Sequence, residues 1–310
     1  MRTPNRKMVD LSVEVAGIKM KNPVLAASGT FGYGTEYLPL VPPGLFGAVI
    51  TKTVTLLPRA GNAPPRVYET PGGMLNSIGL ANVGIERFLA EKLPELLKNH
   101  PVVIVNIAGN TMEEYVELAA MLKGQPGISG IELNISCPNV KQGGVAFGSD
   151  PVQAAKLTAL VKKAIDRPLM VKLSPNVSDI AAVARAVEQA GAGALSLINT
   201  LYGMAVDIDK QRPVLGNVTG GLSGPAVKPV ALYNVFKAAR AVKIPVIGLG
   251  GIMTADDAVE FMLAGAAAVQ IGTASFVNPC AVKEITSGLR DYCLKKGYTK
   301  VSQITGKLAV

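Results

Sequence analysis

The segment "GIELNIS" (130–136) begins a strand–helix–strand unit that ends with "PLMVKLS" (168–174). Both runs have the apolar content expected of strands covered on both faces. Between them, "DPVQAAKLTALVKKAI" (150–165) has helical spacing, with Asp150 as N-cap and Pro151 at the first helical position. The unit therefore predicts two parallel strands joined by a helix.

Similar units continue in both directions along the chain. Further apolar, β-rich runs cover 23–28, 46–53, 101–108, 194–200, 245–251 and 268–274. Eight strands alternating with helices fit a closed (β/α)8 barrel or an open doubly wound sheet. Neither half opens with the G-x-G-x-x-G turn of a dinucleotide fold, so we expect an α/β fold of the TIM-barrel type. No linker rich in Pro, Gly or Ser divides the chain, which favours one domain over residues 1–310.

Three segments lie outside this repeat. "LSVEVAGIKMKNPV" (11–24) predicts an N-terminal hairpin at the end of the barrel opposite the active site. The segments 54–100 and 201–226 both follow strand C-termini, which places them on the face where barrel enzymes hold their active sites. The first contains an extra helix (84–99), and the second is rich in Gly and Pro.

The composition limits the classes of function. The net charge is +9, but Lys and Arg are dispersed, which favours a solvated basic surface over anionic ligands, and anionic ligands over nucleic acid. The uncharged stretch 261–282 contains Gly, Gln, Asn and Pro, so no membrane span is expected, and the N-terminal segment lacks the apolar run of a signal peptide. Three widely spaced cysteines argue against disulfides and zinc and favour a reducing cytoplasm.

Polar side chains mark the C-terminal ends of the predicted strands. Buried lysines and amides are unfavourable unless a polar partner meets them. Their recurrence at corresponding strand ends therefore predicts one polar pocket, lined by Lys52, Asn106, Asn134, Ser136, Lys172, Asn199 and Thr200. The last two strands end differently, in "GLGGI" (248–252) and "IGTA" (271–274), whose backbone N–H groups suit a phosphate.

Cys137 stands just past a strand end on a glycine-bearing loop, whereas Cys280 and Cys293 fit small buried hydrophobes. The only histidine, His100, precedes a strand on the opposite face, so neither a Cys–His pair nor a histidine-based metal site is expected. Two chemistries stay open. Lys172 could form a Schiff base, or Cys137 could remove a proton while a phosphate-bearing redox cofactor takes a hydride. The three asparagines favour the second, because amides suit a flat heterocycle with carbonyl and N–H groups.

Several motifs in this order resemble dihydroorotate dehydrogenase. They include "ASGTFGYG" (27–34), "TKTVTL" (51–56), "ETPGGMLNSIGL" (69–80), "ELNISCPN" (132–139), "LINTLYGMA" (197–205) and "GGLSGPAVKP" (220–229). The cysteine in "SCPN" resembles the soluble class 1 enzymes rather than the membrane-associated class 2. The motifs at 51–56 and 69–80 resemble those of class 1B catalytic subunits more than those of the fumarate-reducing class 1A homodimers.

The resemblance implies an FMN enzyme that oxidises dihydroorotate to orotate in pyrimidine synthesis. It implies Cys137 as the base that takes the C5 proton while the C6 hydride passes to the flavin. It also implies a partner subunit with FAD and a 2Fe-2S cluster, in a heterotetramer around a homodimer. The implied substrate residues are Lys52, Asn76, Ser77, Ile78, Gly79, Leu80, Asn134, Asn199 and Thr200. The implied FMN residues are Ser28, Lys52, Thr53, Asn106, Asn134, Lys172, Ile198, Gly224, Gly250, Gly251, Gly272 and Thr273.

Three alternatives remain open on the sequence. A related flavin barrel acting on uracil-type rings could share the cysteine and the asparagines, although the carboxylate of dihydroorotate needs a cation such as Lys52. A Schiff-base lyase would use Lys172 and bind no flavin. A basic binding module would bind nucleic acid in a salt-sensitive manner.

Overall fold

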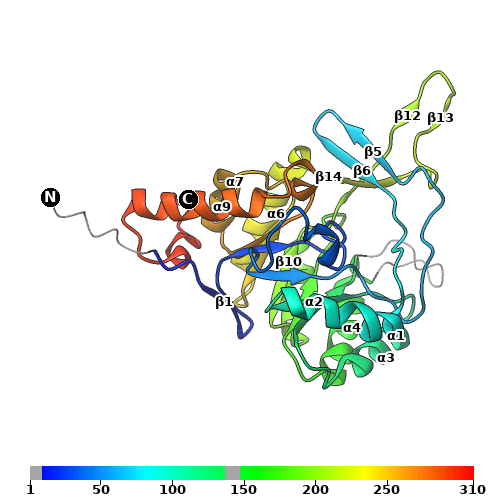
Figure 1. Cartoon of the computed structure of the whole chain (residues 1–310), viewed down its shortest axis with the longest axis horizontal. Helices are drawn as coiled ribbons and strands as arrows, with labels where there is room; N and C mark the ends of the chain where they lie inside the picture. Colours follow the sequence, from blue (N-terminus) through cyan, green and yellow to red (C-terminus); the bar gives the residue numbers. More distant parts are fainter. Residues whose placement is uncertain (1–8, 137–146) are drawn as a thin grey trace.

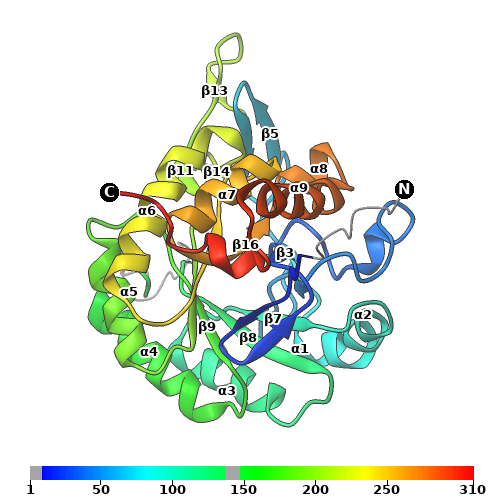
Figure 2. The ribbon, with the colours of Figure 1, turned by 90° about the vertical axis from the view of Figure 1, so that its left-hand side faces the viewer.

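A computed structural model describes residues 9–136 and 147–310 of the chain. Its centre is a closed barrel of eight parallel strands, in which each strand pairs with the next along the chain and the last pairs with the first. Figure 2 shows helices arranged around these strands. The barrel strands are β3 (Val24–Ala26), β4 (Ala48–Ile50), β7 (Val103–Ile107), β8 (Ile128–Asn134), β9 (Leu169–Lys172), β10 (Ala194–Leu197), β15 (Val246–Leu249) and β16 (Ala266–Ile271). The expected TIM barrel is confirmed, with a strand in each of the eight predicted runs.

Side-chain caps mark the starts of two of the surrounding helices, including the predicted cap at Asp150. The side chain of Asp150 accepts hydrogen bonds from the N–H groups of Val152 and Gln153, and Asp179 caps its helix in the same way. The helices are α1 (Ile85–Arg87), α2 (Leu93–Asn99), α3 (Met112–Leu122), α4 (Pro151–Ala164), α5 (Ile180–Gln189), α6 (Lys228–Ala241), α7 (Ala255–Leu263), α8 (Ala274–Val277) and α9 (Ala281–Lys296). A π-helical turn, η2 (Phe88–Lys92), joins α1 to α2, and 3-10 turns form η1 (Thr35–Tyr37), η3 (Pro225–Val227) and η4 (Val301–Ile304). None of the helices in the described ranges is long and apolar enough to cross a membrane.

The predicted N-terminal hairpin consists of β1 (Val13–Val15) and β2 (Ile18–Met20). Its apolar side chains are buried, and Ile18 packs closely against Gly130 near the start of β8. The hairpin therefore closes the N-terminal end of the barrel, as the sequence predicts. Figure 1 shows it on the opposite side of the molecule from β5 and β14.

The two long segments after strands form a structure that the sequence did not predict. They contribute to one antiparallel sheet in the order β11 (Leu201–Gly203), β14 (Gly220–Ser223), β6 (Gly73–Asn76) and β5 (Val67–Thr70). A second, two-stranded ribbon of β12 (Val206–Asp207) and β13 (Arg212–Pro213) extends beyond it (Figure 1). As expected, both segments lie at the C-terminal end of the barrel.

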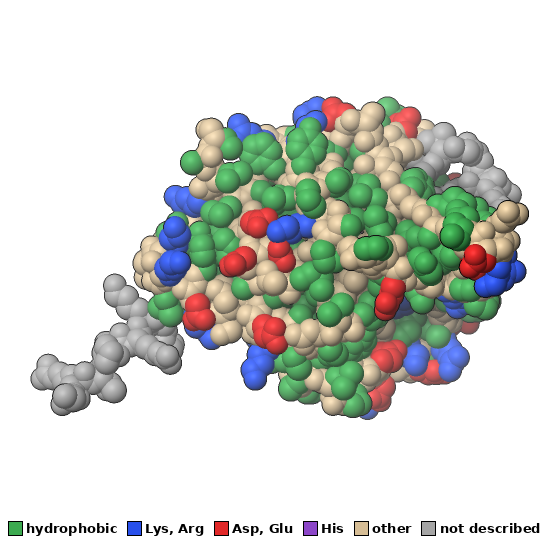
Figure 3. Space-filling view, turned by 90° about the horizontal axis from the view of Figure 1, so that it is seen from above, with side chains coloured by type: hydrophobic (Ala, Val, Ile, Leu, Met, Phe, Trp, Pro, Cys, Tyr) green, Lys and Arg blue, Asp and Glu red, His purple; other side chains and the backbone are tan. Residues whose placement is uncertain are grey.

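The charged side chains are dispersed on the face seen in Figure 3. Lys and Arg are interspersed there with acidic and hydrophobic groups and do not gather in one patch. On this face, the positive net charge belongs to a mixed, solvated surface rather than to a single anion-binding stripe.

Candidate active site

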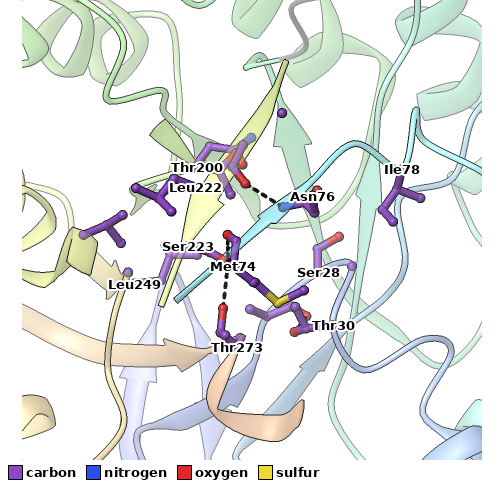
Figure 4. Close-up of a pocket in the computed structure, with 18 of the residues that line it drawn as sticks. Ser28, Thr30, Met74, Asn76, Ile78, Thr200, Leu222, Ser223, Leu249 and Thr273 are labelled. Atoms are coloured by element: carbon purple, nitrogen blue, oxygen red, sulfur yellow. Dashed lines mark hydrogen bonds between the residues drawn. The ribbon is translucent and has the colours of Figure 1, made fainter. Parts of the chain in front are cut away.

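A cavity of about 500 Å³ opens between the barrel and the small antiparallel sheet. Its lower wall is made by residues at or just after the C-terminal ends of the barrel strands, with β7 as the exception. Its upper wall includes Met74 and Asn76 of β6 and Leu222 and Ser223 of β14. Figure 4 shows these residues beside Ser28, and Thr273 directed toward Ser223. The cavity is therefore enclosed by the two parts of the fold that sequence reasoning assigned to the active-site face.

Nearly all of the predicted site residues line this cavity. They are Ser28, Lys52, Thr53, Asn76, Ser77, Ile78, Gly79, Leu80, Asn134, Lys172, Ile198, Asn199, Thr200, Gly224, Gly250, Gly251, Gly272 and Thr273. Asn106 is not among the lining residues, because it lies completely buried inside the barrel. Cys137 lies outside the described residues, so its role as a base stays a prediction.

Two lysines face this cavity from the ends of strands that are not neighbours in the barrel. Lys172 ends β9 and is only 5 % exposed, and Lys52 follows β4. Burial lowers the pKa of the Lys52 ammonium, and the positive charge of Lys172 lowers it further. Two positive charges held together in a buried cavity favour an anionic or electron-rich ligand, which would relieve both the desolvation and the repulsion.

The amides of Asn134 and Asn199 are oriented by the backbone. The Oδ1 of Asn134 accepts from the N–H of Ser136 at 3.1 Å, and the Oδ1 of Asn199 accepts from the N–H of Thr200 at 2.8 Å. Each oxygen is thus occupied locally, while neither Nδ2 has a hydrogen-bond partner within the described part of the chain. Both side chains can therefore offer N–H donors to ligand oxygens.

The loop from Asn76 to Leu80 is held by a residue that the sequence analysis did not single out. Asn62 donates from Nδ2 to the Oγ of Ser77 at 2.8 Å, and its backbone N–H donates to the carbonyl of Ile78 at 3.1 Å. Asn76 itself donates to the carbonyl of Gly221 at 3.2 Å, which ties this loop to β14 (Figure 4). No motif quoted above contains Asn62, because its hydrogen bonds join positions that are distant in sequence.

Glycines allow a close approach of backbone on the other side of the cavity. Gly251 has a φ of +76°, and a Cβ there would lie 2.8 Å from the carbonyl oxygen of Gly224. At Gly272 the nearest atom to an added Cβ would be 3.6 Å away, on Thr30. Thr273 donates to the hydroxyl of Ser223 at 2.8 Å. This open, glycine-lined wall has the space and the N–H groups that a phosphate needs.

A buried hydrogen-bond network below the cavity was also missed. It centres on Glu132, which is fully buried and accepts from the Nδ2 of Asn106 at 2.7 Å. Gln270 belongs to the same network and lines the cavity. The buried oxygens Oδ1 of Asn106 and Oε1 of Gln270 have no hydrogen-bond partner in residues 9–136 and 147–310. Together with the glycine-lined wall and the two lysines, these unpaired acceptors fit a ligand with a phosphate and a polar ring, as FMN has.

The chain is similar to known proteins over most of its length. Residues 10–293 match the family model described as dihydroorotate dehydrogenase. The chain belongs to the dihydroorotate dehydrogenase family. The resemblance expected from the motifs is therefore confirmed, and with it the assignment as an oxidoreductase.

Curated relatives in this family are similar over nearly their whole length. A protein of Geotalea daltonii is 56% identical over 97% of this chain and 99% of its own. One of Geotalea uraniireducens is 58% identical over 96% of this chain and 98% of its own. One of Geobacter sulfurreducens is 57% identical over 97% of this chain and 99% of its own. Each is named the catalytic subunit of dihydroorotate dehydrogenase B (NAD(+)).

Proposed function

We propose that this chain is the catalytic subunit of an NAD-linked dihydroorotate dehydrogenase, which oxidises (S)-dihydroorotate to orotate for pyrimidine synthesis. The observation that carries the proposal is the enclosed cavity of about 500 Å³, with two lysines, oriented amides and a glycine-lined wall. The names of the relatives, which are 56–58% identical, support the same assignment.

The residues divide the cavity into two regions. The substrate is proposed to lie between the loop 76–80 and the barrel, where Lys52 pairs with its carboxylate and Asn134 and Asn199 donate to its ring oxygens. Asn76, Ser77 and Thr200 enclose the same region. FMN is proposed to lie across the barrel end, with its phosphate against Gly250, Gly251, Gly272 and Thr273 and its ring near Ser28, Thr53, Asn106, Lys172, Ile198 and Gly224.

In the proposed mechanism, residues of the chain remove a proton from the substrate and place a positive charge beside the flavin ring. Cys137 is proposed to take the C5 proton, which is acidic because it lies next to a carbonyl. Bound FMN supplies the acceptor for the C6 hydride. Lys172 provides a fixed positive charge beside the ring, and the small sheet over the barrel limits access of water to the reacting atoms.

The wider context is part of the same proposal. The relatives are named catalytic subunits, so a second subunit, proposed to carry FAD and a 2Fe-2S cluster, would pass electrons to NAD. We further propose a single domain over residues 1–310, a homodimer within a heterotetramer, and a cytoplasmic location, which suits the odd number of cysteines.

The test is a visible absorption spectrum of the purified chain, followed by anaerobic addition of dihydroorotate. A flavin spectrum that bleaches is the expected result. An unbleached flavin would keep the cofactor but point to another ring substrate, such as a uracil. A colourless protein that does not take up added FMN would overturn the proposal and make borohydride trapping of a Schiff base at Lys172 the next measurement.

A further inference from the structure

A carboxyl group is buried inside the barrel and joins four of its strands. Glu132 on β8 is fully buried and accepts three hydrogen bonds. The donors are the Nδ2 of Asn106 on β7 at 2.7 Å, the Oγ of Ser196 on β10 at 2.7 Å and the Nε2 of Gln270 on β16 at 2.9 Å. In residues 9–136 and 147–310, no lysine or arginine forms an ion pair with Glu132. The proposed mechanism gives this residue no role.

The three bonds fix the orientation of two amide groups. A side-chain amide has nearly the same shape after a 180° turn, so its orientation is decided by its neighbours. The oxygens of Glu132 accept the amide N–H groups of Asn106 and Gln270, whereas an amide carbonyl turned toward the same oxygens would meet another acceptor. Glu132 therefore holds both NH2 groups toward itself and directs both carbonyl oxygens elsewhere.

Those two carbonyl oxygens are the unusual feature. The Oδ1 of Asn106 and the Oε1 of Gln270 are buried, and neither has a partner in the part of the chain that the structure describes. Buried acceptors are normally paired, so two on one network point to a donor that a ligand supplies. Gln270 is one of the residues that line the cavity, although only 1 % of it is exposed, so a ligand there would lie against this network.

We propose that Glu132 is a positioning residue that sets the Gln270 amide, with Asn106 beside it, to accept a hydrogen bond from the ring N–H of the cofactor. The inference rests on the proposed function, because the oxidised flavin ring carries a single N–H, at N3, between two carbonyl groups. Lys172 and the oriented asparagines provide donors in the same cavity. The carboxyl group of Glu132 thus creates the acceptor side of a site that is otherwise rich in donors.

Glu132→Gln tests whether the carboxyl group orients the two amides, because the substitution changes the shape of the side chain very little. The new side chain offers one oxygen and one NH2. Wherever the NH2 lies, it faces Asn106 or the pair of Ser196 and Gln270, so at least one amide must turn to present its carbonyl. Where the Gln270 amide turns, its NH2 group would face the N–H of the ring. Ser196→Ala is the matched control, because it removes one hydrogen bond to Glu132 and leaves both amides oriented.

The measurement is NMR of the holoenzyme loaded with FMN that is labelled with 15N at N3, with the FMN dissociation constant measured in parallel. In the wild-type protein and in Ser196→Ala, the N3–H should exchange slowly with water. In Glu132→Gln the exchange should be at least about tenfold faster, and FMN should bind about 10- to 100-fold more weakly. An N3–H that exchanges fast in the wild type, or equally slowly in both Glu132→Gln and Gln270→Met, would overturn the inference while FMN binding keeps the proposed function intact.

A second variant covers the case in which Glu132→Gln does not fold. Gln270→Met keeps Glu132 and the length of the side chain but removes the carbonyl from the cavity wall. It should also speed the exchange of the N3–H, and slow exchange in this variant would contradict the assignment. A wild-type chain that binds no FMN at all would instead overturn the proposed function, and with it this inference.

Discussion

Lys52 lies within electrostatic reach of Lys172, and the pKa of its ammonium group is lowered first by burial and then by that second positive charge. Lys52 follows β4 and Lys172 is the last residue of β9. These strands are not neighbours in the barrel, so the two charges interact across the barrel end. Without a ligand, the two ammonium groups repel each other. An anion bound between them would be stabilised by both charges.

Replacing Lys52 by Met should weaken the binding of orotate but increase the stability of the substrate-free protein. Orotate should bind at least about 30-fold more weakly, because the substrate carboxylate loses its cation. The substrate-free protein should unfold at a higher temperature, by about 1.5 °C for each kcal/mol of relieved desolvation and repulsion. Orotate titration and thermal unfolding measure the two effects, with Lys19→Met on the exposed face of β2 as the control. An unchanged affinity for orotate would remove Lys52 from the substrate site.

The pH dependence of this stability has a definite sign. The pKa of Lys52 in the folded protein lies below the model-compound value of 10.5, so between these two values the unfolded chain binds more protons and stability rises with pH. The advantage of Lys52→Met should therefore be greatest at neutral pH and shrink as the pH approaches 10.5. Orotate affinity of the wild type should fall over the same window. A constant difference in unfolding temperature from pH 7 to 10.5 would contradict the assignment.

Alanine substitutions at Gly272 and Gly251 should have different effects, one on phosphate binding and the other on backbone strain. Ala at position 272 meets no atom closer than 3.6 Å, so the protein should fold normally, while the methyl group would narrow the proposed phosphate site. FMN affinity should fall about tenfold or more, with little loss of riboflavin affinity. Ala at position 251 should instead destabilise the fold by about 1–3 kcal/mol, because its φ of +76° is unfavourable for a residue with a Cβ. Equal losses of FMN and riboflavin affinity in Gly272→Ala would place the phosphate elsewhere.

The sequence predicted the barrel better than the sheet that covers it. The barrel strands are apolar and buried, so continuous hydrophobicity and regular spacing identified each of them. The strands β11, β14, β6 and β5 are short, mostly half-exposed and contain several glycines. Their pairing joins Met74 to Ser223, a contact that no local pattern encodes. The sheet forms because the barrel holds the two segments on one face.

The site shows the same division between local and distant information. Lys52 and Lys172 were identified because a charged residue at a strand end is locally conspicuous. Asn106 was expected beside the ring, but the structure pairs its NH2 group with Glu132, whose role depends on donors from three other strands. Cys280 was expected to be buried like Cys293, but it is partly exposed, because it is the N-cap residue that precedes α9. The contact of Asn106 with FMN stays a prediction. The position of Cys137 at the cavity also stays a prediction.

Cys137 can be tested without knowledge of its position. Cys137→Ala should retain FMN but reduce it with dihydroorotate at least about 100-fold more slowly, because proton removal loses its base. In the wild type the rate of reduction should increase as the pH rises toward about 8.5, the ordinary pKa of a thiol. Anaerobic stopped-flow absorption measures both, and Cys280→Ala should behave as the wild type. A reduction rate in Cys137→Ala equal to that of the wild type, or independent of pH, would exclude the thiol as the base.

Lys172→Met should alter the cofactor and Lys52 together. Removing the charge of Lys172 removes one of the two causes that lower the pKa of Lys52, so that pKa should rise and the loss of orotate affinity should move to higher pH. Bound FMN should also become harder to reduce, by about 30 mV or more, since a fixed positive charge near the ring favours added electrons. Orotate titration from pH 7 to 10.5 and equilibration with redox dyes measure the two shifts. Lys163→Met, on the exposed face of α4, is the control for a general change of charge. A shift of the potential without any shift of the pH profile would place Lys172 beside the flavin but out of reach of Lys52.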